Sequence, residues 1–145
     1  SVMTVIAWDG KTLAADKQAT SCGLAMTTTK IRQIEDGSVA AYTGDQDSGE
    51  VILQWYEDGA DPMLWPVVQQ TSKGWARLIV ADAKGCRVYD RRPIAVEVED
   101  SFAAWGAGRD FAVAALHCGK SAREAVEIAS LYSIDCGKGM DAFDL

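Results

Sequence analysis

Short apolar and β-branched runs recur near the start of the chain and are interrupted by turn residues. Four such runs precede position 44, at residues 1–8, 11–16, 27–34 and 38–43. Asp9-Gly10 separates the first two and suits a two-residue turn. Residues 35–37, Glu-Asp-Gly, separate the other two. The pattern therefore predicts two consecutive β-hairpins.

Later segments predict more antiparallel strands and a set of helices. The strand pairs are expected at residues 76–81 with 86–90 and at residues 94–98 with 101–105. Helical spacing of apolar residues predicts helices at 48–57, 109–117 and 121–131. Ser121 and Glu124 have the spacing of a capping box, and residues 61–74 read as a loop with a turn or two of helix. This order predicts an α+β fold, with two stacked antiparallel sheets covered by helices.

Length and charge limit the classes of function. The 145 residues, 48% hydrophobic and 24% charged, are typical of a single globular domain spanning positions 1–145. No apolar run approaches the roughly 20 residues needed to cross a bilayer, so we expect a soluble protein with no membrane partner. A net charge of −7 argues against nucleic acid as a partner, since phosphate backbones attract basic surfaces.

The cysteines predict neither a metal site nor a disulfide framework. Four are spread along the chain without CxxC spacing, and His117 is the single histidine. We interpret them as free thiols of a reducing compartment, and the first residues lack the pattern of a signal peptide. We therefore expect a cytoplasmic protein that needs no metal and no cofactor.

Two hydroxyls near the start, those of Ser1 and Thr4, are candidate nucleophiles. With a two-residue loop in the first hairpin, Met3 opposes Asp16 and Thr4 opposes Ala15. Because successive side chains alternate, Ser1 is expected on the face of Asp16 and Thr4 on the other face. A one-residue bulge in the turn would reverse this assignment.

The second hairpin supplies the other groups that such a nucleophile needs. A three-residue turn pairs Lys30 with Tyr42 and brings Gly44 to the same end. The charge of Lys30 would lower the pKa of a nearby α-amine, so that the amine of Ser1 can act as a base near neutral pH. Asp16 would keep the lysine charged, and an N–H near Gly44 would stabilise an oxyanion. These are the parts of an N-terminal-nucleophile hydrolase.

Four segments in order, TLAADKQAT, KIRQI, AAYTGD and AAWGAGRD, resemble the proteasome β-subunit and HslV peptidase family, as found in bacterial proteasome homologues. The resemblance implies a four-layer αββα sandwich and threonine- or serine-type endopeptidase activity on unfolded polypeptides. It also implies a homo-oligomer of stacked six- or sevenfold rings, with an ATP-dependent unfoldase as a possible partner.

Carried over position by position, the resemblance implies a set of site residues. The catalytic ones are Ser1, Asp16, Lys30 and Gly44; Thr20 and Tyr42 would bind substrate; Asp135 and Gly108 would support the site. Thr4 is the alternative nucleophile, after removal of Met3.

The chain departs from the family pattern in three places. Serine replaces the N-terminal threonine, Ala107 replaces the serine of a G-S-G motif, and residues 44–75 are shorter than the family's helical pair. The short segment argues against docking of an unfoldase. Two alternatives stay open: a ring-forming scaffold or binding subunit with little or no activity, and a small-amide hydrolase that uses the same chemistry.

Overall fold

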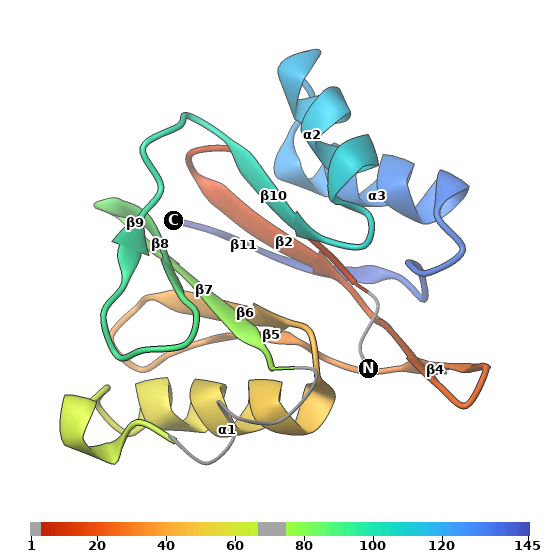
Figure 1. The fold of residues 1–145 in the computed structure, drawn as a ribbon. Helices are drawn as coiled ribbons and strands as arrows, with labels where there is room; N and C mark the ends of the chain where they lie inside the picture. The colour runs from red at the N-terminus through yellow and green to blue at the C-terminus, as the bar shows by residue number, and fades with distance from the viewer. Residues whose placement is uncertain (1–3, 67–74) are drawn as a thin grey trace.

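Two antiparallel sheets lie face to face in the computed structural model, which describes residues 4–66 and 75–145 (Figure 1). The first sheet has the order β10-β1-β2-β11, with bounds Ala103–Gly106, Val5–Trp8, Thr12–Asp16 and Met140–Asp144. The second has the order β5-β6-β7-β8-β9, with bounds Ile31–Gln33, Val39–Thr43, Arg77–Asp82, Gly85–Tyr89 and Val96–Glu97. A separate ribbon joins β3 (Gln18–Ser21) to β4 (Leu24–Thr27).

Helices cover the outer face of each sheet. The pair α2 (Arg109–His117) and α3 (Ala122–Tyr132) packs on the first sheet, whereas α1 (Gln46–Glu57) packs on the second (Figure 1). A short 3-10 helix, η1 (Pro62–Leu64), follows α1. The resulting order of layers, helix, sheet, sheet and helix, confirms the predicted α+β fold and its αββα arrangement. No helix in the described part of the chain is long and apolar enough to cross a membrane.

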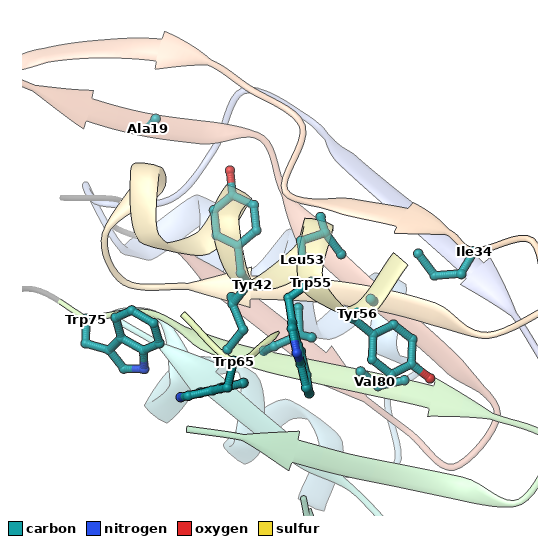
Figure 2. Close-up of a cluster of buried hydrophobic side chains, with 12 residues drawn as sticks. Ala19, Ile34, Tyr42, Leu53, Trp55, Tyr56, Trp65, Trp75 and Val80 are labelled. Carbon is teal, nitrogen blue, oxygen red and sulfur yellow. The ribbon is translucent and has the colours of Figure 1, made fainter. Parts of the chain in front are cut away.

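Strand alternation divides the core into three apolar layers. Ile6, Leu13 and Ile79 lie between the sheets, while Val5 and Ala14, which alternate with them, face α2 and α3. The third layer lies between the second sheet and α1 and is rich in aromatic rings (Figure 2). Both faces of each central strand are therefore buried, which explains the nearly continuous apolar runs of the sequence.

The helices and the register of the second hairpin were predicted correctly from short sequence patterns. The side chain of Ser121 accepts a hydrogen bond from the amide of Glu124, and the Glu124 carboxylate accepts one from the Ser121 amide. This is the predicted capping box. In the second hairpin, Ile31 pairs with Ala41, which is the register that a three-residue turn predicts.

Two predicted strand pairings are wrong. In the first hairpin Trp8 pairs with Leu13 rather than with Lys11. The Asp9 carboxylate accepts hydrogen bonds from the amides of Lys11 and Thr12, so that four residues instead of two lie between the paired residues of the hairpin.

The second error concerns residues 94–98 and 101–105, which were expected to pair with each other. The strands found there are β9, which pairs with β8 in the second sheet, and β10, which pairs with β1 in the first. Their link therefore crosses from one sheet to the other. The strand β11 and the ribbon β3-β4 were not predicted.

Candidate active site

A threonine, a lysine and an aspartate meet in a fully buried cluster at one end of the two sheets. The Thr4 hydroxyl donates to Asp16 Oδ1 at 2.7 Å, and Lys30 Nζ donates to Thr4 Oγ1 at 2.5 Å. Lys30 Nζ also lies 2.6 Å from Asp16 Oδ1. All three residues have 0% exposure. The hydroxyl thus lies between a cation and an anion, away from bulk solvent.

The backbone around Asp16 holds its carboxylate in place. Asp16 ends β2, and its Oδ1 accepts a hydrogen bond from the Val5 amide at 3.1 Å. Its Oδ2 accepts one from the Gly137 amide at 3.0 Å, from the loop between α3 and β11. Such bonds satisfy a buried carboxylate, whose burial without partners would be costly. Asp16 therefore links the start of β1 to the loop before β11.

Lys30 reaches this cluster from the second sheet. It precedes β5, and its backbone carbonyl accepts a hydrogen bond from the Tyr42 amide at 3.1 Å, as the predicted register requires. Its ammonium donates to the Gln18 carbonyl oxygen at 2.8 Å, in addition to Thr4 and Asp16. Burial lowers the pKa of Lys30 below its ordinary value, although the charge of Asp16 opposes this shift. The site therefore depends on the two sheets remaining in contact.

The expected orientation of Thr4 is wrong. Alternation along the hairpin turned its side chain away from Asp16, whereas the two side chains are hydrogen-bonded. The error in the hairpin register does not explain this. It moved the partner of each β1 residue by two positions along the chain, which leaves every side chain on the face of the sheet that was predicted for it. The reason is that β1 begins at Val5, so Thr4 lies outside the regular strand and does not follow its alternation. Ser1 lies outside the described residues.

Two glycines of the AAWGAGRD segment form the wall behind Thr4. Gly106 has a φ of +97°, and a Cβ there would collide with the Thr4 carbonyl oxygen. The Gly108 amide donates to that same oxygen at 3.1 Å. A Cβ at Gly108 would lie 2.8 Å from Cys136 Sγ and 2.9 Å from Val5 Cβ. Gly108 was predicted as a site residue and Gly106 was not, although both belong to the same motif.

Gly44 and Thr20 each line a pocket on the surface. Gly44 has a φ of +108°, and a Cβ there would lie 2.6 Å from the Trp75 carbonyl oxygen, so glycine is required. Thr20 lies on β3, where its hydroxyl accepts from the Gln18 side chain at 3.4 Å. Gln18, which was not predicted as a site residue, thus connects Lys30 to Thr20.

Tyr42 and Asp135 have different surroundings. Tyr42 is fully buried in the aromatic layer under α1, where its hydroxyl donates to Glu50 at 2.9 Å (Figure 2). In this structure it therefore acts as a core residue and not as the wall of an open pocket.

Asp135 is half-buried in the loop that also carries Cys136 and the Gly137 amide bonded to Asp16. Burial raises the pKa of the Cys136 thiol to about 11, which keeps it protonated and weakly reactive.

Solved structures share this fold at low sequence identity. The eukaryotic HslV from Trypanosoma brucei aligns with a TM-score of 0.72 and 20% identity, covering 98% of both chains. Thiobacillus denitrificans BPH aligns with a TM-score of 0.74 and 19% identity, covering 99% of this chain and 97% of that one. BPH in complex with epoxomicin aligns with a TM-score of 0.72 and 19% identity, covering 99% and 98%. No protein-family model and no curated protein matches the sequence.

Proposed function

We propose that this chain is an N-terminal-nucleophile peptidase in which the hydroxyl of Thr4 attacks the peptide carbonyl. The observation that carries the proposal is the buried contact of Thr4 Oγ1 with Lys30 Nζ and Asp16 Oδ1. The shared fold with HslV and with BPH, which was solved with epoxomicin, supports the same class of reaction. Ser1, the first choice from the sequence, stays a prediction.

The chemistry requires a free α-amine on the nucleophile. An amide nitrogen is not basic, so the proposal includes cleavage of the bond between Met3 and Thr4. The α-amine then takes the proton of the Thr4 hydroxyl, and the oxygen bonds to the substrate carbonyl carbon. The positive charge of Lys30 lowers the pKa of this amine and so increases its unprotonated fraction near neutral pH.

The remaining steps return the enzyme to its starting state. The peptide C–N bond breaks, and the proton on the α-amine passes to the leaving nitrogen. This leaves the acyl half of the substrate as an ester on Thr4. Water, deprotonated by the same amine, hydrolyses the ester and restores the hydroxyl. We assign the oxyanion-stabilising N–H to Gly44 and the binding of the acyl-half backbone to Thr20, as the family resemblance implies.

The proposal also includes assembly and substrate class. We propose a cytoplasmic homo-oligomer of stacked rings that hydrolyses unfolded polypeptides. Large apolar side chains exposed on α2, in the last turn of α3 and just after it support self-association, because such groups are rarely left uncovered: Phe111, Leu131, Tyr132 and Ile134. Native mass spectrometry measures the assembly directly. An unfoldase partner is not part of the proposal.

The decisive experiment compares single variants of the two candidate nucleophiles. Thr4→Ala is expected to reduce hydrolysis of a fluorogenic peptide and of unfolded casein by at least about three orders of magnitude. Thr4→Ser should restore part of the activity, because it keeps both hydroxyl and amine. Thr12→Ala is the matched control: it also removes a buried hydroxyl bonded to a carboxylate, Asp144, but at the far end of β2.

Intact mass measurement completes the test. The active wild-type protein should lack residues 1–3, and treatment with epoxomicin should add one ligand mass to the Thr4 protein but not to Thr4→Ala. Full activity in Thr4→Ala together with loss in Ser1→Ala would move the nucleophile to Ser1. Lack of both hydrolysis and adduct would favour the scaffold alternative, and cleavage of single amides without casein cleavage would favour the small-amide one.

A further inference from the structure

An arginine-rich pocket of about 500 Å³ adjoins the Thr4 site. Its lining includes Gly44, Gly106, Asp90, Arg77, Arg91 and Arg109. Gly106 packs directly against the Thr4 carbonyl oxygen, so one wall of the pocket is also a wall of the candidate active site. Gly44, to which the proposed function assigns the oxyanion-stabilising N–H, lines the same pocket, so the pocket lies beside the expected position of the substrate carbonyl.

The charge of this pocket is opposite to that of the whole chain. Its described lining carries three guanidinium groups and one carboxylate, whereas the chain has a net charge of −7. Arg109 is oriented by a hydrogen bond from its Nη1 to the Gly106 carbonyl oxygen, 3.0 Å long. Arg77 Nε lies 3.7 Å from Asp90 Oδ2, with both side chains about half exposed. Because so exposed an ion pair is weak, it leaves Arg77 able to attract another anion.

A second pocket near the site has the opposite charge. It measures about 330 Å³ and is lined by Thr20, Asp45 and Asp47 among other residues. Its described lining contains these two carboxylates and no lysine or arginine. Anionic groups on a substrate would be repelled from this pocket and attracted to the arginine pocket.

We propose that the arginine pocket binds an anionic side chain or a terminal carboxylate on the leaving half of the substrate. The inference rests on the proposed function, which assigns the acyl half to Thr20, and it adds that the leaving half extends to the other side of Thr4. Guanidinium groups suit this role because they bind carboxylates through paired hydrogen bonds and stay charged at all relevant pH values. The enzyme would thus prefer bonds that are followed by an acidic residue.

The test uses peptides that differ only in Glu or Gln. One pair carries the difference in the first two residues after the cleaved bond, and a second pair carries it before the bond. We expect wild-type kcat/KM to favour Glu by roughly fivefold in the first pair only, the size expected for an exposed ion pair, and the preference to shrink at high salt. Mass spectrometry of the products identifies the cleaved bond.

Charge variants locate the effect. Arg109→Gln and Arg77→Gln are each expected to bring the ratio of kcat/KM for the Glu peptide to kcat/KM for the Gln peptide closer to one. Arg123→Gln is the matched control, because it removes the same charge from α3, where Arg123 pairs with Asp144. Equal rates for both peptides of the first pair, or a preference that survives Arg109→Gln and Arg77→Gln together, would overturn the inference and leave the proposed function intact.

A binding measurement separates this inference from the proposed function. If no peptide is cleaved, the proposed function fails. Calorimetric titration of Thr4→Ala protein with the uncleaved Glu and Gln peptides then decides whether the pocket selects an anion. Tighter binding of Glu, lost in Thr4→Ala/Arg109→Gln, supports anion selection, and equal binding of both peptides contradicts it.

Discussion

Lys30 is a fully buried amine whose protonated form is held by three oxygen atoms. They belong to the Thr4 hydroxyl, the Asp16 carboxylate and the Gln18 carbonyl group. Loss of hydration nevertheless outweighs these contacts and lowers the pKa of the lysine. Its protonation is therefore coupled to folding.

Because of this coupling, Lys30 should make the protein more stable as the pH rises. Its folded pKa lies below the ordinary value of 10.5, so between these two values the unfolded chain binds more protons than the folded one. The contribution of Lys30 to the free energy of unfolding therefore increases with pH through this window and levels off above pH 10.5. Urea denaturation at a series of pH values measures the free energy of unfolding of the wild type and of Lys30→Met. We expect the difference between the two to shift in favour of the wild type as the pH rises.

The comparison removes the opposite effect of the thiols. Burial raises the pKa of Cys136 to about 11 and that of Cys86 to about 12, which makes stability fall with pH above their ordinary value of 9.0. Both proteins are therefore compared in a Cys86→Ala/Cys136→Ala background, because the charge of Lys30 also shifts the pKa of Cys136 and the thiol effect would not cancel by itself. Lys17→Met is the control, because Lys17 forms a partly exposed ion pair with Asp141. A difference in free energy of unfolding between the wild type and Lys30→Met that does not change with pH would contradict the coupling of Lys30 protonation to folding.

The residues of the site were easier to predict than their contacts. Asp16 and Lys30 were identified by motif, and the register of the second hairpin placed Lys30 correctly relative to Tyr42. The contact of Thr4 with Asp16 could not be derived in that way. Strand alternation governs side-chain direction only where the backbone is regular, and Thr4 precedes the first residue of β1.

At the scale of elements, the turn from β10 into α2 forms the wall of the site. It contains Gly106, whose positive φ and close approach to Thr4 both exclude a side chain. The geometry of this turn determines where the start of β1 lies. A change in the turn should therefore affect the site and the stability together.

Gly106→Ala is expected to destabilise the protein by at least about 3 kcal/mol and to reduce activity. The positive φ alone costs about 1–2 kcal/mol, and the added methyl group displaces the Thr4 carbonyl. Gly119→Ala is the matched control, since Gly119 has a φ of +88° and nothing within 4 Å of an added Cβ. Urea denaturation and peptide hydrolysis measure both variants. Equal losses of stability and activity in the two variants would show that the contact with Thr4 does not matter.

Elements with local signals were predicted well, and elements defined by distant pairing were not. The capping box of α3 and the spacing of α2 depend on residues close in sequence. The strand β11 pairs with β2, more than a hundred residues earlier, and β10 pairs with β1 rather than with its neighbour β9. Nothing in a short segment encodes such a partner, because the choice depends on how the whole apolar surface is covered.

At the scale of the molecule, the site joins the two sheets. Thr4 directly precedes β1 and Asp16 ends β2, both in the first sheet. Lys30 directly precedes β5 in the second sheet. The layer between the sheets is partly built of small side chains, among them Ala15, Ala41 and Ala81. These alanines allow a close approach of the sheets, which brings Lys30 within hydrogen-bond distance of Asp16.

Ala41→Leu should therefore reduce activity by more than its effect on stability explains. The larger side chain overfills the layer between the sheets, costs about 1–3 kcal/mol, and separates Lys30 from Asp16. Ala40→Leu is a close control: Ala40 is the preceding residue of β6, is equally buried, and faces α1 instead. Both variants should lose similar stability in urea denaturation. Only Ala41→Leu should lower kcat for the folded protein, and an equal kcat in the two would refute the idea that sheet spacing sets the geometry of the site.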